Sequence, residues 1–418
     1  MTSPAHVTGR LADMRDLTPI AETNAHADPQ AVYRRLRAEW GEVAPVELAP
    51  GIHAWLVMGH EELLYVLRHE RLFVKDTSHW RDYVEGRVKP DFPLAPLMFP
   101  RPNAFHADGD EHRRLRVPLE TAANGVRLRQ TVQQVREVCS DLIGDFSGKG
   151  HADLLADYAQ MIPTLAIGRM MGLTPELARQ AHHAQMDLFS MGERAQAGNA
   201  RFTEILTGLV RLRKAEPADD MTTVIVQHEN LRDDAERIHQ MALMIAAAAE
   251  CTMAWIGSSL LLLLTDPRFS GRMRGGRLGI DDALDEVLWR EPPMANLPAR
   301  YAVHDTHLGG QLVRQGDALL LGFAAANADP RVHSDDRWNE LGNRSHLAWS
   351  AGAHVCPAQV PARIIVRTAV EAVLHELPGL RLTVPATELG RHESPWARCP
   401  ATLPVEFTPV AAAEASGG

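Results

Sequence analysis

The stretch that decides the fold, residues 349–363, reads WSAGAHVCPAQVPAR. Small residues and Gly352 lead to His354 and Cys356, and an apolar helical pattern begins within two turns of the cysteine. A thiolate just before a helix N-terminus is stabilised by the helix dipole and by free N–H groups, which makes the sulfur a ready metal ligand. The alternative is a buried, inert cysteine in a loop. The rest of the chain decides between these two interpretations.

Length, composition and charge narrow the class of protein. The chain has 418 residues, 45% hydrophobic and 23% charged, which is typical of a globular protein. At roughly 150 residues per domain this length predicts two or three domains, although one large domain also fits. The net charge of −10 argues against nucleic acid as a partner, because a nucleic-acid binder presents a basic surface.

The cysteines and the N-terminus predict a cytoplasmic protein. Cys139, Cys251, Cys356 and Cys399 form no Cys-x-x-Cys pair, which disfavours a structural zinc site and a disulfide framework. Residues 1–18 have no apolar core of the length a signal peptide needs. The apolar segment 241–264 is long enough to span a bilayer, but Glu250 in its middle would cost about 2.5–3.5 kcal/mol there. We therefore expect a long buried helix and no membrane partner.

The pattern of apolar residues predicts a mainly α protein with a small β region. A hairpin is expected over 43–48 and 52–58, a long loop over 76–103, and a second small sheet over 300–321. Short strands are expected over 380–384 and 401–407. Helices are expected over 28–40, 59–72, 110–120, 126–146, 152–171, 175–191, 199–215, 233–264 and 279–290.

The opening stretch resembles the haem-binding loop of the cytochrome P450 family, Phe-Gly-x-Gly-x-His-x-Cys. The matching residues are Trp349 in place of the usual Phe, Gly352, His354, Cys356 at the ligand position and the closing pair Ala362-Arg363. Ser350 and Ala358 replace glycines of the family and Pro361 replaces a leucine. The first two are small, so close approach of the backbone to a flat macrocycle is kept. In such a site the axial thiolate pushes electron density towards the iron.

A second resemblance supplies cations for the two carboxylates of a haem. Residues 110–116 are similar to the family's Glu-His-x-x-x-Arg element, and His112 and Arg116 fall on one helical face. An exposed, charged helix start is the alternative. Arg300, in a Leu-Pro-Ala-Arg context, resembles a further propionate ligand, and His354 of the loop completes the set. The resemblance implies haem b as the cofactor.

The long helix and the segment before the proline pair resemble the family with departures. Residues 247–252, AAAECT, resemble its oxygen-activating element, with Glu250 as the acid, Cys251 in the usual Thr position and Ala248 in the usual Gly position. The resemblance implies Glu250, Cys251 and Thr252 as catalytic residues, with protons arriving through Thr252 or water; a buried Glu paired with an Arg is the alternative.

The family's Glu-x-x-Arg pair is only half present. Glu286 is retained, but Trp289 stands in the Arg position, and Arg290 comes one residue late, about 100° further around the helix. Arg337, in an Asp-x-Arg-Trp context like the family's Asp-x-Arg-Phe, is expected to pair with Glu286.

The resemblance covers residues 28–408 and implies a single-domain cytochrome P450 fold, with haem between the long central helix and the Cys-loop helix. Residues 1–27 would be a partly disordered extension and 409–418 a tail. The implied activity is that of a soluble bacterial-type haem-thiolate monooxygenase using dioxygen. No flavin or nicotinamide module is apparent, so electrons would come from a ferredoxin-type partner with its reductase. Arg113, Arg114, Arg363 and Arg367 would form a basic face for it or a solvated surface.

The expected pocket is apolar with scattered polar groups, which suits a medium-sized natural product. Its lining is expected from Trp80, Met98, Phe99, Met244, Ala247, Ala248, Met294, Asn296, Leu297 and Trp396. The departures at Trp289 and Cys251 resemble variants that couple aromatic cyclic dipeptides oxidatively, so both monooxygenation and aryl coupling are open. Two other classes remain. These are a haem-binding protein without turnover, such as a sensor or carrier, and a helical scaffold without haem.

Overall fold

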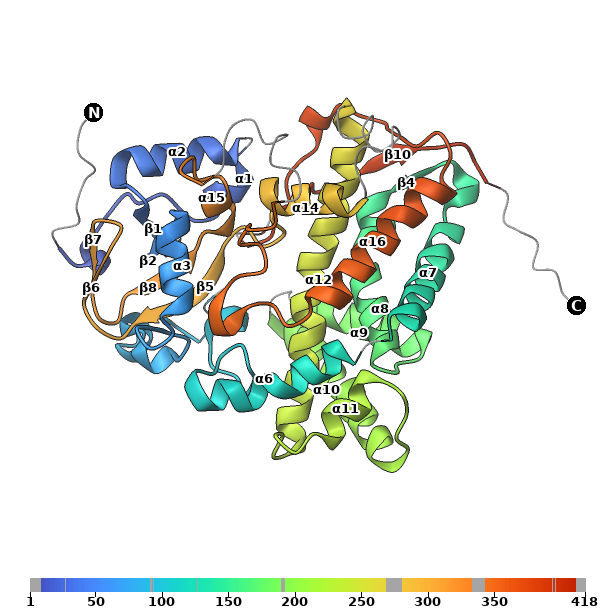
Figure 1. Ribbon diagram of the computed structural model, residues 1–418, viewed down its shortest axis with the longest axis horizontal. Helices are drawn as coiled ribbons and strands as arrows, with labels where there is room; N and C mark the ends of the chain where they lie inside the picture. The colour runs from blue at the N-terminus through green and yellow to red at the C-terminus, as the bar shows by residue number, and fades with distance from the viewer. Residues whose placement is uncertain are drawn as a thin grey trace, which may run out of the picture. The chain divides into compact units, whose positions relative to one another are not determined.

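The structure is a computed structural model, shown in Figure 1. It describes residues 9–26, 28–90, 92, 94–125, 127–188, 192–267, 280–332, 343–392, 394 and 396–410. The chain forms two compact units. The first comprises Met1–Arg113, Leu288–Cys356 and His392–Arg398, and the second comprises Arg114–Val287, Pro357–Arg391 and Cys399–Gly418, each where described. Arg337 lies outside the described residues, so its predicted pairing stays a prediction.

A five-stranded sheet organises the first unit. Its strand order is β1 (Val43–Ala49), β2 (Ile52–Val57), β8 (Ala318–Leu321), β5 (Leu297–Ala302) and β3 (Phe73–Val74). The predicted hairpin of β1 and β2 is confirmed. The predicted separate second sheet is wrong, because β8 pairs in parallel with β2 and β5 pairs with β8. Only β6 (Thr306–Leu308) and β7 (Gln311–Val313) pair by themselves.

Both faces of this sheet are covered by apolar side chains. α2 (Pro29–Trp40) begins as predicted, with Asp28 accepting a hydrogen bond from the Ala31 N–H and Pro29 at the first helical position. Side chains of α2 join alternate strand residues in one core cluster. α3 (His60–Arg68), shorter than the predicted 59–72, packs with the intervening strand residues in a second cluster. Successive strand residues fall in different clusters because the side chains of a pleated strand point alternately to its two faces.

The predicted long loop 76–103 is partly wrong, because it contains short helices. They are η2 (Thr77–His79), α4 (Arg81–Val84) and α5 (Ala95–Met98). Two more short helices of the first unit are α1 (Glu22–Ala25) and α15 (Phe323–Asn327). α6 (Gly109–Asn124) contains the predicted helix 110–120 and tolerates Pro118 inside it.

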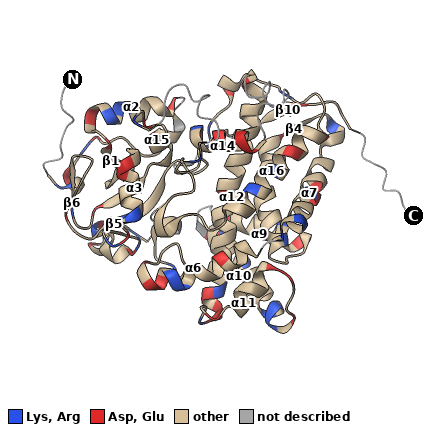
Figure 2. Ribbon diagram, viewed as in Figure 1, with Lys and Arg blue, Asp and Glu red and all other residues tan. Residues whose placement is uncertain are grey.

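Helices dominate the second unit. They are α7 (Leu128–Gly144), α8 (Ile162–Met170), α9 (Pro175–Leu188), α10 (Gly192–Ala215), α11 (Met221–Gln227), α12 (Asp234–Thr265), α14 (Ile280–Arg290) and α16 (Gln359–Glu376). α12 packs against α8, α10, α11 and α16. Figure 2 shows both basic and acidic residues on the helices of the chain. The unit also holds a small sheet of β4 (His151–Asp153), β10 (Pro404–Glu406) and β9 (Arg381–Leu382).

The helix predicted over 152–171 is wrong in its first part. Residues 151–153 form β4 by pairing with β10, about 250 residues later in the chain. A π-helix, Leu154–Ala159, follows before α8 begins.

The long helix α12 is apolar enough, by length and composition, to cross a membrane. It is the one such helix among the described residues, and 56% of its most apolar window is buried within the protein. The core helix of a globular protein passes the same test, and the sequence predicts a long buried helix here.

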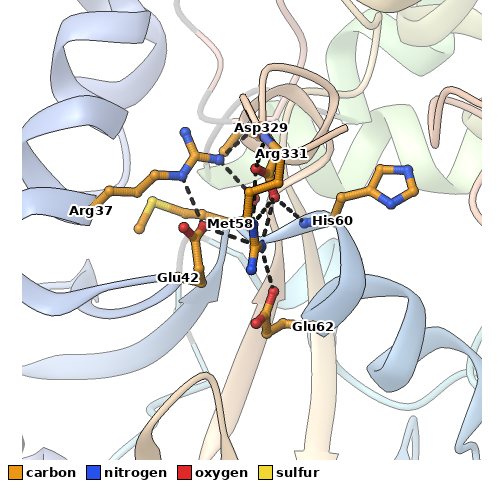
Figure 3. Close-up of polar contacts among 8 residues, drawn as sticks. Arg37, Glu42, Met58, His60, Glu62, Asp329 and Arg331 are labelled. Atoms are coloured by element: carbon orange, nitrogen blue, oxygen red, sulfur yellow. Dashed lines mark hydrogen bonds and ion pairs between the residues drawn. The ribbon is translucent and has the colours of Figure 1, made fainter. Parts of the chain in front are cut away.

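An ion-pair network holds the start of α3 (Figure 3). Asp329 is fully buried and accepts hydrogen bonds from the His60 N–H at 2.9 Å and from the Arg331 guanidinium. Arg331 also donates to Glu62 at 2.9 Å. Burial raises the pKa of Asp329, but the hydrogen bonds from Arg331 and His60 outweigh it and lower the pKa to about 2. These contacts therefore hold the N-terminus of α3 against Asp329 and Arg331, which follow α15 in the chain.

We expect Asp329→Asn to destabilise the protein by about 2 kcal/mol at pH 7. The folded pKa of Asp329 lies below its unfolded value, so this stability is present above pH 4 and lost as the pH falls towards 2. Urea unfolding of both proteins at pH 7 and at about pH 3 measures it, and the difference between them is expected to shrink at the lower pH. The control is Asp28→Asn, an exposed pair with Arg34 in which Asn still caps the helix, and its expected loss of stability is much smaller. Equal losses in both variants contradict the assignment.

Candidate cofactor site

The loop that carries Cys356 has a fixed shape. The Cys356 N–H donates to the Trp349 carbonyl at 2.9 Å, which closes the loop, and the Val355 N–H donates to the Gly352 carbonyl at 3.1 Å. Gly352 has φ 68°, and a Cβ there would lie 2.1 Å from the Leu67 carbonyl oxygen at the end of α3. Only glycine fits this close approach. Cys356 itself is half-buried.

The segment leading into this loop is tied to the end of α14. Trp289 is buried, and its indole N–H donates to the Asn343 carbonyl at 2.8 Å. Asn327 donates from its amide to the Leu288 carbonyl at 2.9 Å and accepts from the Leu347 N–H at 2.8 Å. Trp289, in the position where the family has an arginine, therefore supplies a hydrogen-bond donor to the backbone before the loop.

Glu286, the acid of the half-kept pair, lies on α14 in the second unit and is 7% exposed. Its neighbour Asp285 pairs with Arg363. The remaining residue of the predicted pair, Arg337, is outside the described residues.

Two predicted haem-carboxylate ligands lie in contact. The imidazoles of His112 and His354 stack with centroids 4.0 Å apart and an interplanar angle of 28°. His112 is 2% exposed, at the start of α6, and His354 belongs to the Cys356 loop. The tertiary structure thus brings together residues 242 positions apart in the chain.

Arg300 is a buried cation with unused donors. It is 1% exposed, and within the described part of the chain its Nε and Nη1 have no hydrogen-bond acceptor. Burial lowers the pKa of Arg300 to about 10. The preceding Ala299 has φ 72° at an irregularity in the β5–β8 pairing, and such bulges redirect side chains.

These observations fit the haem that the resemblance implies. A buried guanidinium with free N–H groups calls for an anion, and haem carries two carboxylates. The stacked His112 and His354 add donors, and the half-buried Cys356 supplies a sulfur ligand. Arg116 differs, because its Nε donates to Glu120 at 2.8 Å on the same helix.

The α12 residues of the predicted site lie in the second unit. Glu250 and Cys251 are partly exposed, while Thr252 is 3% exposed. Ala247 is exposed, and Met244 and Ala248 are partly so, whereas residues 252–260 of the same helix are buried. An apolar helix stretch with this accessibility suits a pocket wall.

The other predicted pocket residues lie in the first unit. Trp80, Met98 and Trp396 are buried, and Phe99, Met294 and Leu297 are partly buried. Trp80 stacks on Tyr301 with centroids 5.4 Å apart. Asn296 is fully buried and donates to the Thr23 hydroxyl at 3.0 Å, so its amide N–H binds within the protein.

The arginines of the predicted basic face each lie beside a carboxylate, and the choice between a docking face and a solvated surface stays a prediction. Arg113 pairs with Asp110, and Arg114 pairs with Glu236 at 2.7 Å. Arg363 and Arg367 likewise pair with carboxylates of α14 and α16. Each guanidinium is thus matched by an acid.

Sequence reasoning missed the buried cation Lys75, which is 2% exposed. It follows directly after β3, and its Nζ lies 3.7 Å from the centre of the Phe105 ring. The local sequence around Lys75 shows only a lysine directly after two apolar strand residues. Exposed edge strands have the same pattern, so it does not identify a buried cation.

Known proteins resemble this chain over most of its length. No family model matches the chain. It is 30% identical over 386 residues to nocardicin C N-oxygenase from Nocardia uniformis subsp. tsuyamanensis, with 90% of this chain and 94% of that protein covered. It is 29% identical over 400 residues to 2-hydroxy-5-methyl-1-naphthoate 7-hydroxylase from Streptomyces carzinostaticus, covering 93% and 97%.

A solved structure agrees as well. CYP154A1 from Streptomyces coelicolor A3(2) matches with a TM-score of 0.80 at 30% identity, over 94% of this chain and 99% of that one. The predicted fold class is confirmed by this likeness.

Proposed function

Because the chain belongs to the cytochrome P450 family and is a monooxygenase of that family, we propose that it binds haem b and oxidises a medium-sized natural product. Bacterial members of the family act on small molecules with dioxygen and need redox partners. One observation carries the proposal for this chain. It is the grouping, in one unit, of Cys356, the stacked His112–His354 pair and the buried donors of Arg300.

Each of these residues has a definite role. Cys356 would ligate the iron, and the Trp349 carbonyl holds its backbone N–H so that the sulfur keeps one position. His112, His354 and Arg300 would bind the haem carboxylates and set the orientation of the macrocycle. When bound, haem supplies the activation of dioxygen, which a thiolate ligand favours by donating electron density. On α12 we assign proton delivery to Glu250, Cys251 and Thr252, on the family resemblance alone.

The substrate class is inferred from the apolar side chains and from relatives. Aromatic and sulfur-containing side chains, among them Trp80, Phe99 and Met294, cluster in the first unit. Such surfaces favour an aromatic substrate over a simple fatty acid. Relatives are named for oxidising a naphthoate and nocardicin C. An aromatic cyclic dipeptide is our specific proposal, oxidised by oxygen insertion or by aryl coupling.

Electrons are proposed to come from a ferredoxin with its reductase in the cytoplasm. The pairing of Arg113, Arg114, Arg363 and Arg367 with carboxylates means that attraction over long range contributes little to docking. We expect association to depend weakly on salt.

Oxygen consumption tests the proposed function. Purified protein with a surrogate ferredoxin, reductase and NADPH is expected to consume oxygen faster when an aromatic cyclic dipeptide is added, with an oxidised product seen by mass spectrometry. The reduced, carbon monoxide-bound protein is expected to show the red-shifted band of a thiolate-ligated haem.

The alternatives give different results. A sensor or carrier would show the band but no substrate-dependent oxygen consumption, and a scaffold without haem would show no haem absorption. The same assay on Cys251→Thr addresses the proton route. More product per NADPH means that Cys251 is a poor relay, and an unchanged ratio means that protons arrive by another route.

A further inference from the structure

Strand pairing places two buried cations opposite each other. β3 and β5 pair antiparallel, with Phe73 opposite Ala302 and Val74 opposite Tyr301. Continued by one residue, this register would set Lys75 opposite Arg300, and the Lys75 Nζ lies 3.5 Å from the carbonyl oxygen of Pro298 on the same strand as Arg300. The exposures of Lys75 and Arg300 are 2% and 1%. Like charges directly opposite in a sheet are destabilising, and withdrawal from water raises the cost.

The surroundings of the two cations do not neutralise them. Lys75 Nζ lies over the Phe105 ring and 3.5 Å from the Pro298 carbonyl oxygen. Asp108 is nearby, but its Oδ2 accepts two backbone N–H groups, one of them that of Lys75, at 2.8 and 2.9 Å. Among the residues that the structure describes, neither Lys75 nor Arg300 forms an ion pair with a carboxylate.

The protonation behaviour of the pair agrees with this geometry. Burial, and then the charge of Arg300, lower the pKa of Lys75 well below its usual value. Burial likewise lowers the pKa of Arg300, although Asp108 and Glu70 act against it. An anion bound between the two side chains would raise the pKa of both groups.

We propose that Lys75 and Arg300 together bind one carboxylate of the haem. The inference rests on the proposed function, because it takes the haem as the source of that carboxylate. Two charge-assisted hydrogen bonds would replace one repulsive contact. Lys75 thereby adds a cation to the set expected from the motifs, in which the Arg116 guanidinium already binds Glu120.

Haem release tests this role. The full-length protein is prepared with haem or with haem dimethyl ester, which lacks the acidic groups, and loss of the cofactor to excess apomyoglobin is followed by absorbance. Lys75→Met is expected to release haem about 10- to 100-fold faster than the wild type. With the dimethyl ester, the two proteins are expected to release it at similar rates.

Matched variants separate binding from folding. Lys89→Met removes the same charge from an exposed lysine and is expected to leave release unchanged. Lys75→Arg keeps a cation and is expected to stay within about threefold of the wild type. If Lys75→Met does not fold, Lys75→Gln is measured with both cofactors in its place.

Several outcomes would overturn the inference. A release ratio that is the same with haem and with its ester means that Lys75 acts only in packing. Benzoate serves as a free carboxylate probe. If Lys75→Met releases haem at the wild-type rate but binds added benzoate more weakly, Lys75 binds the carboxylate of a ligand other than haem. If the wild-type protein shows the thiolate-type band, either of these results overturns the role of Lys75 but not the proposed function. If the wild-type protein lacks that band, the role of Lys75 and the proposed function are both overturned.

Discussion

We expect Cys356→Ala to remove the red-shifted, thiolate-type band from the reduced, carbon monoxide-bound protein and to lower product formation to background. This is the largest effect we expect. Cys356 is the only cysteine in the loop, and its backbone is held by the hydrogen bond to Trp349 and by the close seat of Gly352 on α3. No neighbouring side chain of the loop is able to supply a second sulfur.

The matched control is another cysteine. Cys139 is fully buried, and burial raises the pKa of its thiol to about 12, so it stays protonated at neutral pH. Cys139→Ala is expected to lower stability by the loss of packed volume but to keep the full band. Cys356→Ser, which preserves size, is expected to lose the band as Cys356→Ala does. A band that persists in either Cys356 variant refutes the assignment of the iron ligand.

Trp289→Phe is expected to give the second-largest effect, a partial conversion of the band to that of haem without thiolate. The substitution removes one indole N–H and leaves the half-buried Asn343 carbonyl without its donor, which costs about 1 kcal/mol. The segment that precedes the Cys356 loop is destabilised. Further hydrogen bonds through Asn327 and Ser350 link this segment to the end of α14 and to the loop. The loop therefore loosens before the protein unfolds.

A second tryptophan distinguishes this local effect from general destabilisation. Trp55 is also buried, and its indole N–H donates to Asp317 at 2.9 Å in the central sheet. Trp55→Phe is expected to lower the thermal midpoint by a similar amount while keeping the thiolate-type band. The carbon monoxide spectrum and the thermal midpoint of both variants are the measurements. Equal loss of the band in both variants contradicts a specific role for Trp289.

Much of the site was predictable because its residues fall in local motifs. The spacing of Gly352, His354 and Cys356 is set by a tight turn, and such a turn needs residues in fixed order. His112 lies at a helix start that its own segment encodes. Comparisons with known proteins confirm the family that these motifs indicated.

Other features were not predictable, because they depend on partners far along the chain. Residues 151–153 form a strand only because β10 pairs with them. Some of the arginines expected on the docking face pair with acids on other elements, such as Glu236 for Arg114 and Asp285 for Arg363. The periodicity of apolar residues predicts each helix or strand separately, so it does not predict strand pairing or ion pairs between distant segments.

The sequence by itself determined the Cys356 loop, the helices with strong apolar periodicity and the family. These properties are local, since a turn, a cap or an amphipathic face is encoded within a few residues. Tertiary structure alone decided the stacking of His112 on His354, the donor role of Trp289 and the placing of Lys75 opposite Arg300. The physical reason is that burial and charge pairing depend on what the fold brings next to a residue, and strand register sets that neighbour.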